Sequence, residues 1–255
     1  MSYAMNVDYV HITKNYNKRL MEPDRITVHH VVGQASVESI AKMFPASRQS
    51  SCNYAIGSDG RLMGMVPDEY RSWCSSSQAN DTRAYTIECS DDPTPPYKFN
   101  DVVYNKLVDL CEALCRKHGK TKLLWISDKN SALTHKMQSN EMLLTVHRWF
   151  SATQCPGEWM MDHMGNLAED VTKRLSGTST GAVLYRVQVG AFKEKKNAGN
   201  YAETLKGMGF STYVVNVNGF HKVQVGAFSD IDNANAMVAE LSRKGIKSVI
   251  MQDNV

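Results

Sequence analysis

A chain of 255 residues with 42% hydrophobic and 22% charged side chains is long enough for one large or two smaller globular domains. The net charge is only +3, with 20 basic and 20 acidic side chains up to residue 181 and 9 and 6 after it. The dense basic stripe of a nucleic-acid-binding domain is therefore absent, and we expect no nucleic-acid partner. No apolar stretch approaches the about 20 residues of a membrane span, and no secretory signal is recognisable at the N-terminus. Without an export signal, the six cysteines are expected to be reduced.

The residue pattern in the first quarter of the chain predicts an N-terminal arm, a strand, a helix and a hairpin. Residues 1–20 are polar and aromatic without a clear period and are expected to form an ordered arm. The β-branched run 26–30 predicts a buried strand that ends in two histidines. Apolar positions at helical spacing predict a helix between Ser36 and Pro45, and a turn at 58–60 predicts a hairpin over 54–66.

The next stretch alternates between strand and helix. Residues 71–82 are rich in Ser, Asn and Asp around a tryptophan, which suits a loop at the rim of a site. The segment 86–89 predicts a buried strand, 101–118 an amphipathic helix and 123–126 a short apolar strand. This alternation predicts an α/β fold with a central mixed β-sheet flanked by helices.

The C-terminal part contains a flexible linker and an internal repeat. Residues 176–181 are a linker by composition, so we expect a catalytic domain over 1–175 and a second domain over 182–255. The segment 185–192 recurs at 221–228, each with the sequence Val-Gln-Val-Gly-Ala-Phe. A helix-compatible stretch and a second strand follow each copy, which predicts a small α+β, ferredoxin-like βαββαβ domain.

Three residues could hold a zinc ion. His147 and Cys155 are suitable ligand types eight residues apart, and either His29 or His30 could supply the third. In a strand these two histidines point to opposite faces, so only one is expected to join. Three protein ligands leave zinc's fourth position for water, which is typical of a catalytic site. His135 and His163 are alternatives to His147 as a ligand, but both lack its spacing to Cys155.

These motifs resemble the zinc-dependent N-acetylmuramoyl-L-alanine amidases, a family that includes phage lysozyme-like amidases and peptidoglycan-recognition proteins. The resemblance covers most of residues 20–175 and depends on Val-His-His at 28–30, Asn-Tyr at 53–54, Ile-Glu at 87–88, and Thr153 and Cys-Pro-Gly after His147. It implies that zinc is held by His29, His147 and Cys155.

The same resemblance implies roles for three further residues. Glu88 matches the catalytic glutamate, although a pairing with Arg83 would also explain a buried carboxylate. Tyr54 and Thr153 match hydrogen-bonding residues that would stabilise the oxyanion. Tyr54 could instead be a core tyrosine, and Thr153 could cap the turn before Pro156. Three cysteines have no place in the family pattern: Cys52, Cys74 and Cys89.

The repeat and element order of residues 182–255 resemble the SPOR domain, which implies binding of peptidoglycan glycan strands. An RNA-binding module shares this element order, but the first strands lack the aromatic residues on which bases stack.

The sequence therefore predicts a peptidoglycan hydrolase that cleaves the amide between N-acetylmuramic acid and L-alanine and contacts both stem peptide and glycan. A wall-degrading domain without a recognisable secretory signal resembles phage endolysins. These enzymes stay in the host cytoplasm until they are released to the cell wall. Two alternatives stay open: a non-catalytic peptidoglycan receptor, and a cysteine peptidase with Cys155 as nucleophile and His147 as base.

Overall fold

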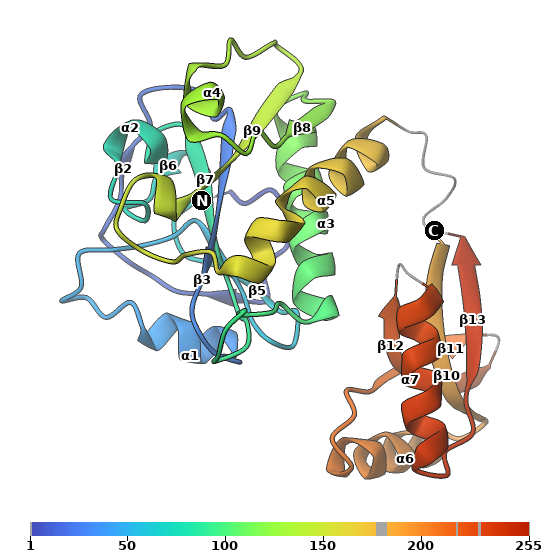
Figure 1. Cartoon of the computed structure of the whole chain (residues 1–255). Coiled ribbons are helices and arrows are strands. Elements are labelled where there is room, and N and C mark those ends of the chain that lie inside the picture. The colour runs from blue at the N-terminus through green and yellow to red at the C-terminus, as the bar shows by residue number, and fades with distance from the viewer. Residues whose placement is uncertain (1, 177–182, 218, 229–230, 255) are drawn as a thin grey trace. The chain divides into compact units, whose positions relative to one another are not determined.

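The computed structural model describes residues 2–176, 183–217, 219–228 and 231–254. Contacts between Cα atoms divide the chain into two units, Met1–Thr178 and Ser179–Val255, and each is described by itself (Figure 1). The linker expected at 176–181 lies outside the described residues apart from its first position. Within the described part of the chain, no helix is both long and apolar enough to cross a membrane.

The first unit is built on a seven-stranded sheet in the order β1-β5-β4-β7-β3-β9-β8 (Figure 1). Neighbouring strands are parallel except for β4 and β5, which form the expected hairpin, so the sheet is mixed as predicted. The strands are β1 (Tyr9–Val10), β3 (Arg25–His30), β4 (Tyr54–Ile56), β5 (Leu62–Gly64), β7 (Ala84–Cys89), β8 (Lys122–Leu124) and β9 (Glu141–Val146).

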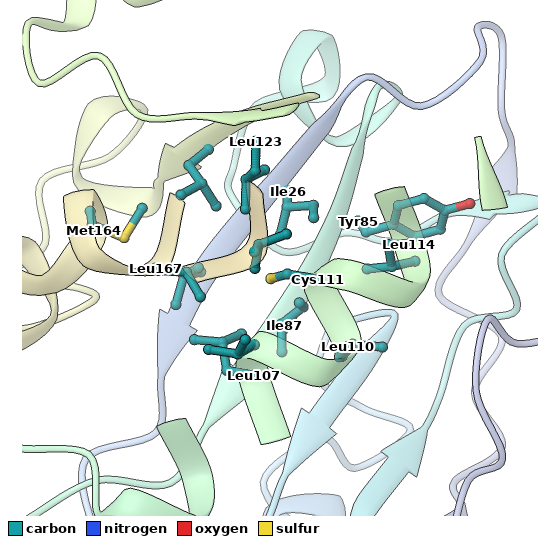
Figure 2. Close-up of a cluster of buried hydrophobic side chains, with 14 of the residues drawn as sticks. Ile26, Tyr85, Ile87, Leu107, Leu110, Cys111, Leu114, Leu123, Met164 and Leu167 are labelled. Atoms are coloured by element: carbon teal, nitrogen blue, oxygen red, sulfur yellow. The ribbon is translucent and has the colours of Figure 1, made fainter. Parts of the chain in front are cut away.

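Helices cover both faces of this sheet. The long helices α3 (Asp101–Lys117) and α5 (Glu158–Leu175) pack on one face and enclose the larger core. Figure 2 shows side chains of both helices around Ile26 of β3 and Ile87 of β7. Helix α1 (Val37–Lys42) packs with residues of β4 and β5 in a second core on the opposite face. The sheet therefore separates two apolar layers, as an α/β fold requires.

Short elements complete the first unit. The expected rim loop contains β6 (Tyr70–Arg71) and helix α2 (Gln78–Asp81), and β6 pairs with β2 (Asn17–Lys18) of the N-terminal arm. Helix α4 (Lys129–Thr134) follows β8, and the 3-10 helix η1 (His147–Trp149) follows β9 directly.

The second unit has the predicted βαββαβ order. Its antiparallel sheet runs β11-β12-β10-β13, and two helices pack on it around one apolar core. The elements are β10 (Val183–Phe192), α6 (Lys195–Gly207), β11 (Tyr213–Val217), β12 (Phe220–Phe228), α7 (Ile231–Arg243) and β13 (Val249–Asn254).

The repeated strands β10 and β12 are direct neighbours in this sheet. Gln188 of the first copy is the register partner of Gln224, its equivalent in the second. The repeat glycines also have the same role, because a Cβ atom at Gly190 or Gly226 would lie 2.8 or 2.6 Å from the ring of the phenylalanine two residues later. The sequence repeat is therefore a structural repeat in which each strand pairs with its copy.

Candidate metal centre

Two histidines leave the ends of neighbouring parallel strands. In the register of β3 and β9, Val28 is the partner of Val146, and the next residues along the two strands are His29 and His147. Their rings lie 4.8 Å apart between centroids, and His29 is only 1% exposed. Parallel pairing therefore brings together two imidazoles that are 118 positions apart in the sequence.

The turn before α5 brings a buried cysteine to the same place. The Sγ atom of Cys155 lies 3.6 Å from Nδ1 of His29, and one donor atom from each of His29, His147 and Cys155 lies within 4.8 Å of the others. Both backbone groups of Cys155 are held, since Thr153 Oγ1 accepts a hydrogen bond from the Cys155 amide and the Arg148 amide donates to the Cys155 carbonyl.

The protonation states and free atoms of this cluster suit a metal ion. Burial lowers the pKa of both His29 and His147, so both rings are neutral at neutral pH and have lone pairs to offer. The Nε2 atoms of both rings are buried and have no hydrogen-bond partner among the described residues. Burial raises the pKa of the Cys155 thiol, and a bound cation would displace its proton. Two nitrogens and one sulfur at these separations fit zinc, whose bonds to such ligands are about 2.0–2.3 Å long.

Glu88 lies beside the cluster. It is the register partner of His29 on the adjacent strand β7, and its carboxylate joins His29 in a second group of close donor atoms. Burial raises the pKa of Glu88 to about 8. The alternative pairing with Arg83 does not occur, because that guanidinium binds Asp24. A carboxyl group that titrates near neutrality is suited to proton transfer.

His30 points away from the cluster and supports the cysteine turn. Its Nδ1 atom lies 2.6 Å from Oδ2 of Asp91, and both side chains are buried. A Cβ atom at Gly157 would lie 3.3 Å from the same ring nitrogen, and Gly157 has φ +88°, so glycine is required there. Of the two histidines, only His29 belongs to the cluster of donor atoms, and its role as a metal ligand stays a prediction.

Tyr54 does not reach the cluster, which corrects the role that the resemblance implied. It is the register partner of Ile87, one position away from Glu88, and its ring lies in the larger core on the opposite face of the sheet. Its hydroxyl donates to Oδ1 of Asp68 over 2.5 Å and accepts a hydrogen bond from the Ala4 amide. The alternative of a core tyrosine therefore describes Tyr54, and we omit it from the proposed site.

The remaining sequence candidates are also placed. Thr153 is exposed and caps the Cys155 amide, as its alternative interpretation expected. His135 binds Glu141 and His163 binds the Trp159 carbonyl, so neither belongs to the cluster.

A cleft of about 300 Å³ opens next to His147. The expected rim loop supplies several of the lining residues, including Arg71, Trp73 and Cys74, and Arg48 also lines the cleft. Sequence reasoning left Cys74 unassigned, yet its Sγ atom donates to Oε1 of Glu88 over 3.6 Å. The position of Cys74 directly after Trp73 of the rim loop is the sequence feature that could have indicated its place near the site.

Comparison with known families identifies both units. A family model described as N-acetylmuramoyl-L-alanine amidase matches residues 19–158, which is more than half of the chain. The chain belongs to this family. The SPOR domain model matches residues 181–252, so this amidase carries a C-terminal SPOR domain. The named activity of the family places the chain among peptidoglycan amidases.

Solved structures with related folds come from bacteria and phage. The peptidoglycan-binding domain of the Bacillus subtilis cell wall lytic enzyme CwlC is 37% identical, covers 29% of this chain and 95% of its own, and has a TM-score of 0.28. The Staphylococcus aureus hydrolase AmiA is 14% identical over 69% of this chain and 89% of its own, with a TM-score of 0.49.

The Ph2119 endolysin from a Thermus scotoductus bacteriophage is 20% identical over 62% of this chain and 90% of its own, with a TM-score of 0.41. Because these TM-scores are below 0.5, the family match decides the assignment. Among curated proteins, no match to the chain is found.

Proposed function

We propose that this amidase hydrolyses the amide between N-acetylmuramic acid and L-alanine with a zinc ion held by His29, His147 and Cys155. The observation that carries the proposal is the convergence of these three donor atoms within 4.8 Å, with Glu88 beside them. Zinc bound there would lower the pKa of water at its open position to about 7 and polarise the amide carbonyl.

The protein's own groups would handle the protons. Glu88 is the carboxyl group next to His29 on the adjacent strand, and it would accept a proton from the attacking water. It would then donate that proton to the nitrogen of L-alanine as the amide bond breaks. A carboxyl pKa near 8 supports both steps, because the group can gain and lose a proton near neutral pH.

Thr153 has a different role in this proposal from the one that the resemblance implied. Its hydroxyl accepts from the Cys155 amide, so it would hold the cysteine in place for the metal. A supporting hydrogen bond of this kind orients a ligand and tunes its affinity. Oxyanion stabilisation would then depend mainly on zinc.

A cysteine-peptidase mechanism is less well supported. The imidazole next to the Cys155 thiol is that of His29, and burial raises the thiol's pKa. A nucleophilic cysteine needs the opposite, a pKa lowered by its surroundings. The receptor alternative has no observation in its favour, because the buried cysteine ligand is present.

We also propose that the SPOR domain holds the enzyme on glycan strands while the first unit cleaves the stem peptide, and that the enzyme acts as an endolysin. The presence of both units in one chain supports the first point, since tethering raises the local concentration of substrate. Detection of the protein outside intact, unlysed cells would contradict the endolysin role.

The test is mass spectrometry of purified peptidoglycan digested by the full chain, with and without a chelator and with zinc added back. We expect stem peptides that begin at L-alanine, lost on chelation and restored by zinc. Binding without cleavage would identify a receptor. Chelator-resistant cleavage within the stem peptide would assign Cys155 as a nucleophile.

A further inference from the structure

Two arginines in the cleft beside His147 have no carboxylate partner among the described residues. Arg48 and Arg71 both line this cleft of about 300 Å³, and neither forms an ion pair there. Of the nine arginines of the first unit, Arg19 donates to backbone carbonyls. The other six bind a carboxylate within the described part of the chain: Arg25, Arg61, Arg83, Arg116, Arg148 and Arg174. The cleft therefore holds two positive charges without a counter-charge.

Uncharged groups hold both guanidinium groups in place. Arg48 donates a hydrogen bond to the Met43 carbonyl over 2.8 Å, and its guanidinium carbon lies 5.3 Å from the centre of the Phe44 ring. Arg71 donates to Oδ1 of Asn17. A guanidinium group has five N–H donors, so several donors of each arginine remain for a ligand. The two side chains are thus oriented, while their positive charge is not neutralised.

The acidic residue in the described lining of the cleft, Asp81, already has partners for its carboxylate. It is 2% exposed and accepts hydrogen bonds from the Cys74 amide over 3.0 Å and from the Ser75 amide and hydroxyl over 3.1 and 2.5 Å. These bonds direct its charge towards the backbone of the rim loop. The cleft is therefore suited to an anionic group of a ligand.

The proposed substrate carries an anionic group close to the bond that is cleaved. The residue after L-alanine in a stem peptide is a D-glutamate that continues the chain through its side-chain carboxyl group. Its α-carboxyl group is therefore either free or amidated. Two residues of extended chain span at most about 7 Å, so this group lies close enough to the scissile amide to share a cleft with His147. Arginine suits a carboxylate because its planar N–H donors can pair with both oxygens.

We propose that Arg48 and Arg71 bind the free α-carboxylate of this D-glutamate and make the enzyme selective for stem peptides in which the group is not amidated. The inference rests on the proposed function, because it requires that the amide is hydrolysed at the centre that includes His147. Amidation replaces a negative acceptor by a neutral group whose NH₂ is itself a donor. An amidated peptide therefore loses the charge attraction and brings N–H donors towards the N–H donors of the arginines.

The test compares two synthetic substrates that differ only in this group. Both are N-acetylmuramoyl tripeptides with L-lysine in third place and an amidated C-terminus, and the α-carboxyl group of D-glutamate is free in one and amidated in the other. The zinc-loaded full chain is assayed on both, and on purified peptidoglycan with free or amidated D-glutamate. Charge-assisted hydrogen bonds predict that kcat/KM is about 10–100-fold higher for the free acid.

Replacing the arginines should remove this preference. Arg48→Gln and Arg71→Gln should each lower the ratio of the two kcat/KM values, and the double variant should abolish the preference. The ratio does not depend on the fraction of protein that is folded and loaded with zinc, so partial misfolding of a variant does not obscure the result. The control Arg116→Gln, an arginine that pairs with Glu112 on α3, should keep the wild-type ratio.

The outcomes separate this inference from the proposed function. Equal hydrolysis of both substrates by wild type, lost on chelation and restored by zinc, overturns the inference and leaves the proposed function standing. A preference that persists in the double variant also overturns the inference, because another group then recognises the carboxylate. If the wild-type chain hydrolyses none of these substrates, the proposed function is wrong and the inference fails with it.

Discussion

His29 and Glu88 are register partners on the adjacent parallel strands β3 and β7. Their side chains therefore leave the same face of the sheet at the same height. The pairing of these two residues thus places His29, a proposed metal ligand, beside Glu88, the proposed acid–base group. Both are held by strands and not by a flexible loop. Rigid strands suit this purpose because catalytic geometry tolerates only small errors.

Replacing His147 by Asn should abolish metal binding. The loss of one of three proposed ligands should raise the zinc Kd by more than about 100-fold, beyond the cost of losing a supporting residue. Zinc stoichiometry after dialysis, measured by elemental analysis, checks this outcome. His135→Asn is the matched control, since this histidine binds Glu141 instead. Full zinc content in His147→Asn would exclude it as a ligand.

Glu88→Gln should remove activity and keep zinc. General acid–base catalysis contributes about 10²–10⁴-fold, so the rate of peptidoglycan hydrolysis should fall within that range. Release of free stem peptides measures the rate. Glu169→Gln, an exposed glutamate on α5, serves as the control and should hydrolyse like wild type. A rate within twofold of wild type in Glu88→Gln would remove Glu88 from the mechanism.

In the metal-free protein, Glu88 should contribute more to the free energy of unfolding at acidic pH than at alkaline pH. Burial raises the pKa of Glu88 from 4.5 to about 8, so the folded state holds a proton that the unfolded state releases. The stabilising effect of that proton is complete below pH 4.5 and is lost as pH rises to about 8. The difference between the two states is on the order of a few kcal/mol.

Urea unfolding of chelated wild type and Glu88→Gln between pH 5 and 9 isolates this effect. The histidines, whose lowered pKa values act in the opposite direction, are common to both proteins and cancel in the difference. The advantage of the glutamine variant should grow as pH rises. A difference that is constant with pH would contradict the raised pKa.

Thr153 should act through its hydroxyl on the Cys155 amide. Thr153→Val removes that acceptor and should cost about 0.5–1 kcal/mol of stability, with a weaker zinc affinity. Thr153→Ser retains the hydroxyl and should restore both values. Thermal unfolding and zinc competition provide the measurements. A lower kcat in Thr153→Val with unchanged zinc affinity would support the oxyanion role instead.

Tyr54→Phe should weaken the fold and leave the chemistry intact. The change leaves the Ala4 amide without its acceptor and Asp68 with Lys117 as its remaining side-chain partner. We expect a loss of about 1–3 kcal/mol in the free energy of unfolding. Zinc content and the hydrolysis rate should match wild type under conditions where both proteins are folded. A hundredfold loss of rate would return Tyr54 to the active site.

Some elements were predictable because their signals are local. Helix α3 has a clear apolar face, the Asn100 side chain caps its first turn and a glycine with φ +62° follows it. The helix α5 was not predicted, because it starts after Gly157 without any side-chain cap. The strand β9 was also missed. It is buried throughout, and its sequence Glu-Met-Leu-Leu-Thr-Val lacks the alternation of apolar and polar residues that marks a half-buried strand.

By itself, the sequence predicted His147, Cys155 and one of His29 and His30 as metal ligands, and the spacing of its repeat predicted the βαββαβ order. The resemblance to the amidase family then singled out His29 and gave Glu88 its expected role. Only the tertiary structure decided that Tyr54 faces the opposite core and that Cys74 lies beside Glu88 and His29. The physical reason is that alternation along one strand shows only which of its side chains share a face. The register between strands and the path of the loops decide which side chains from different segments lie together.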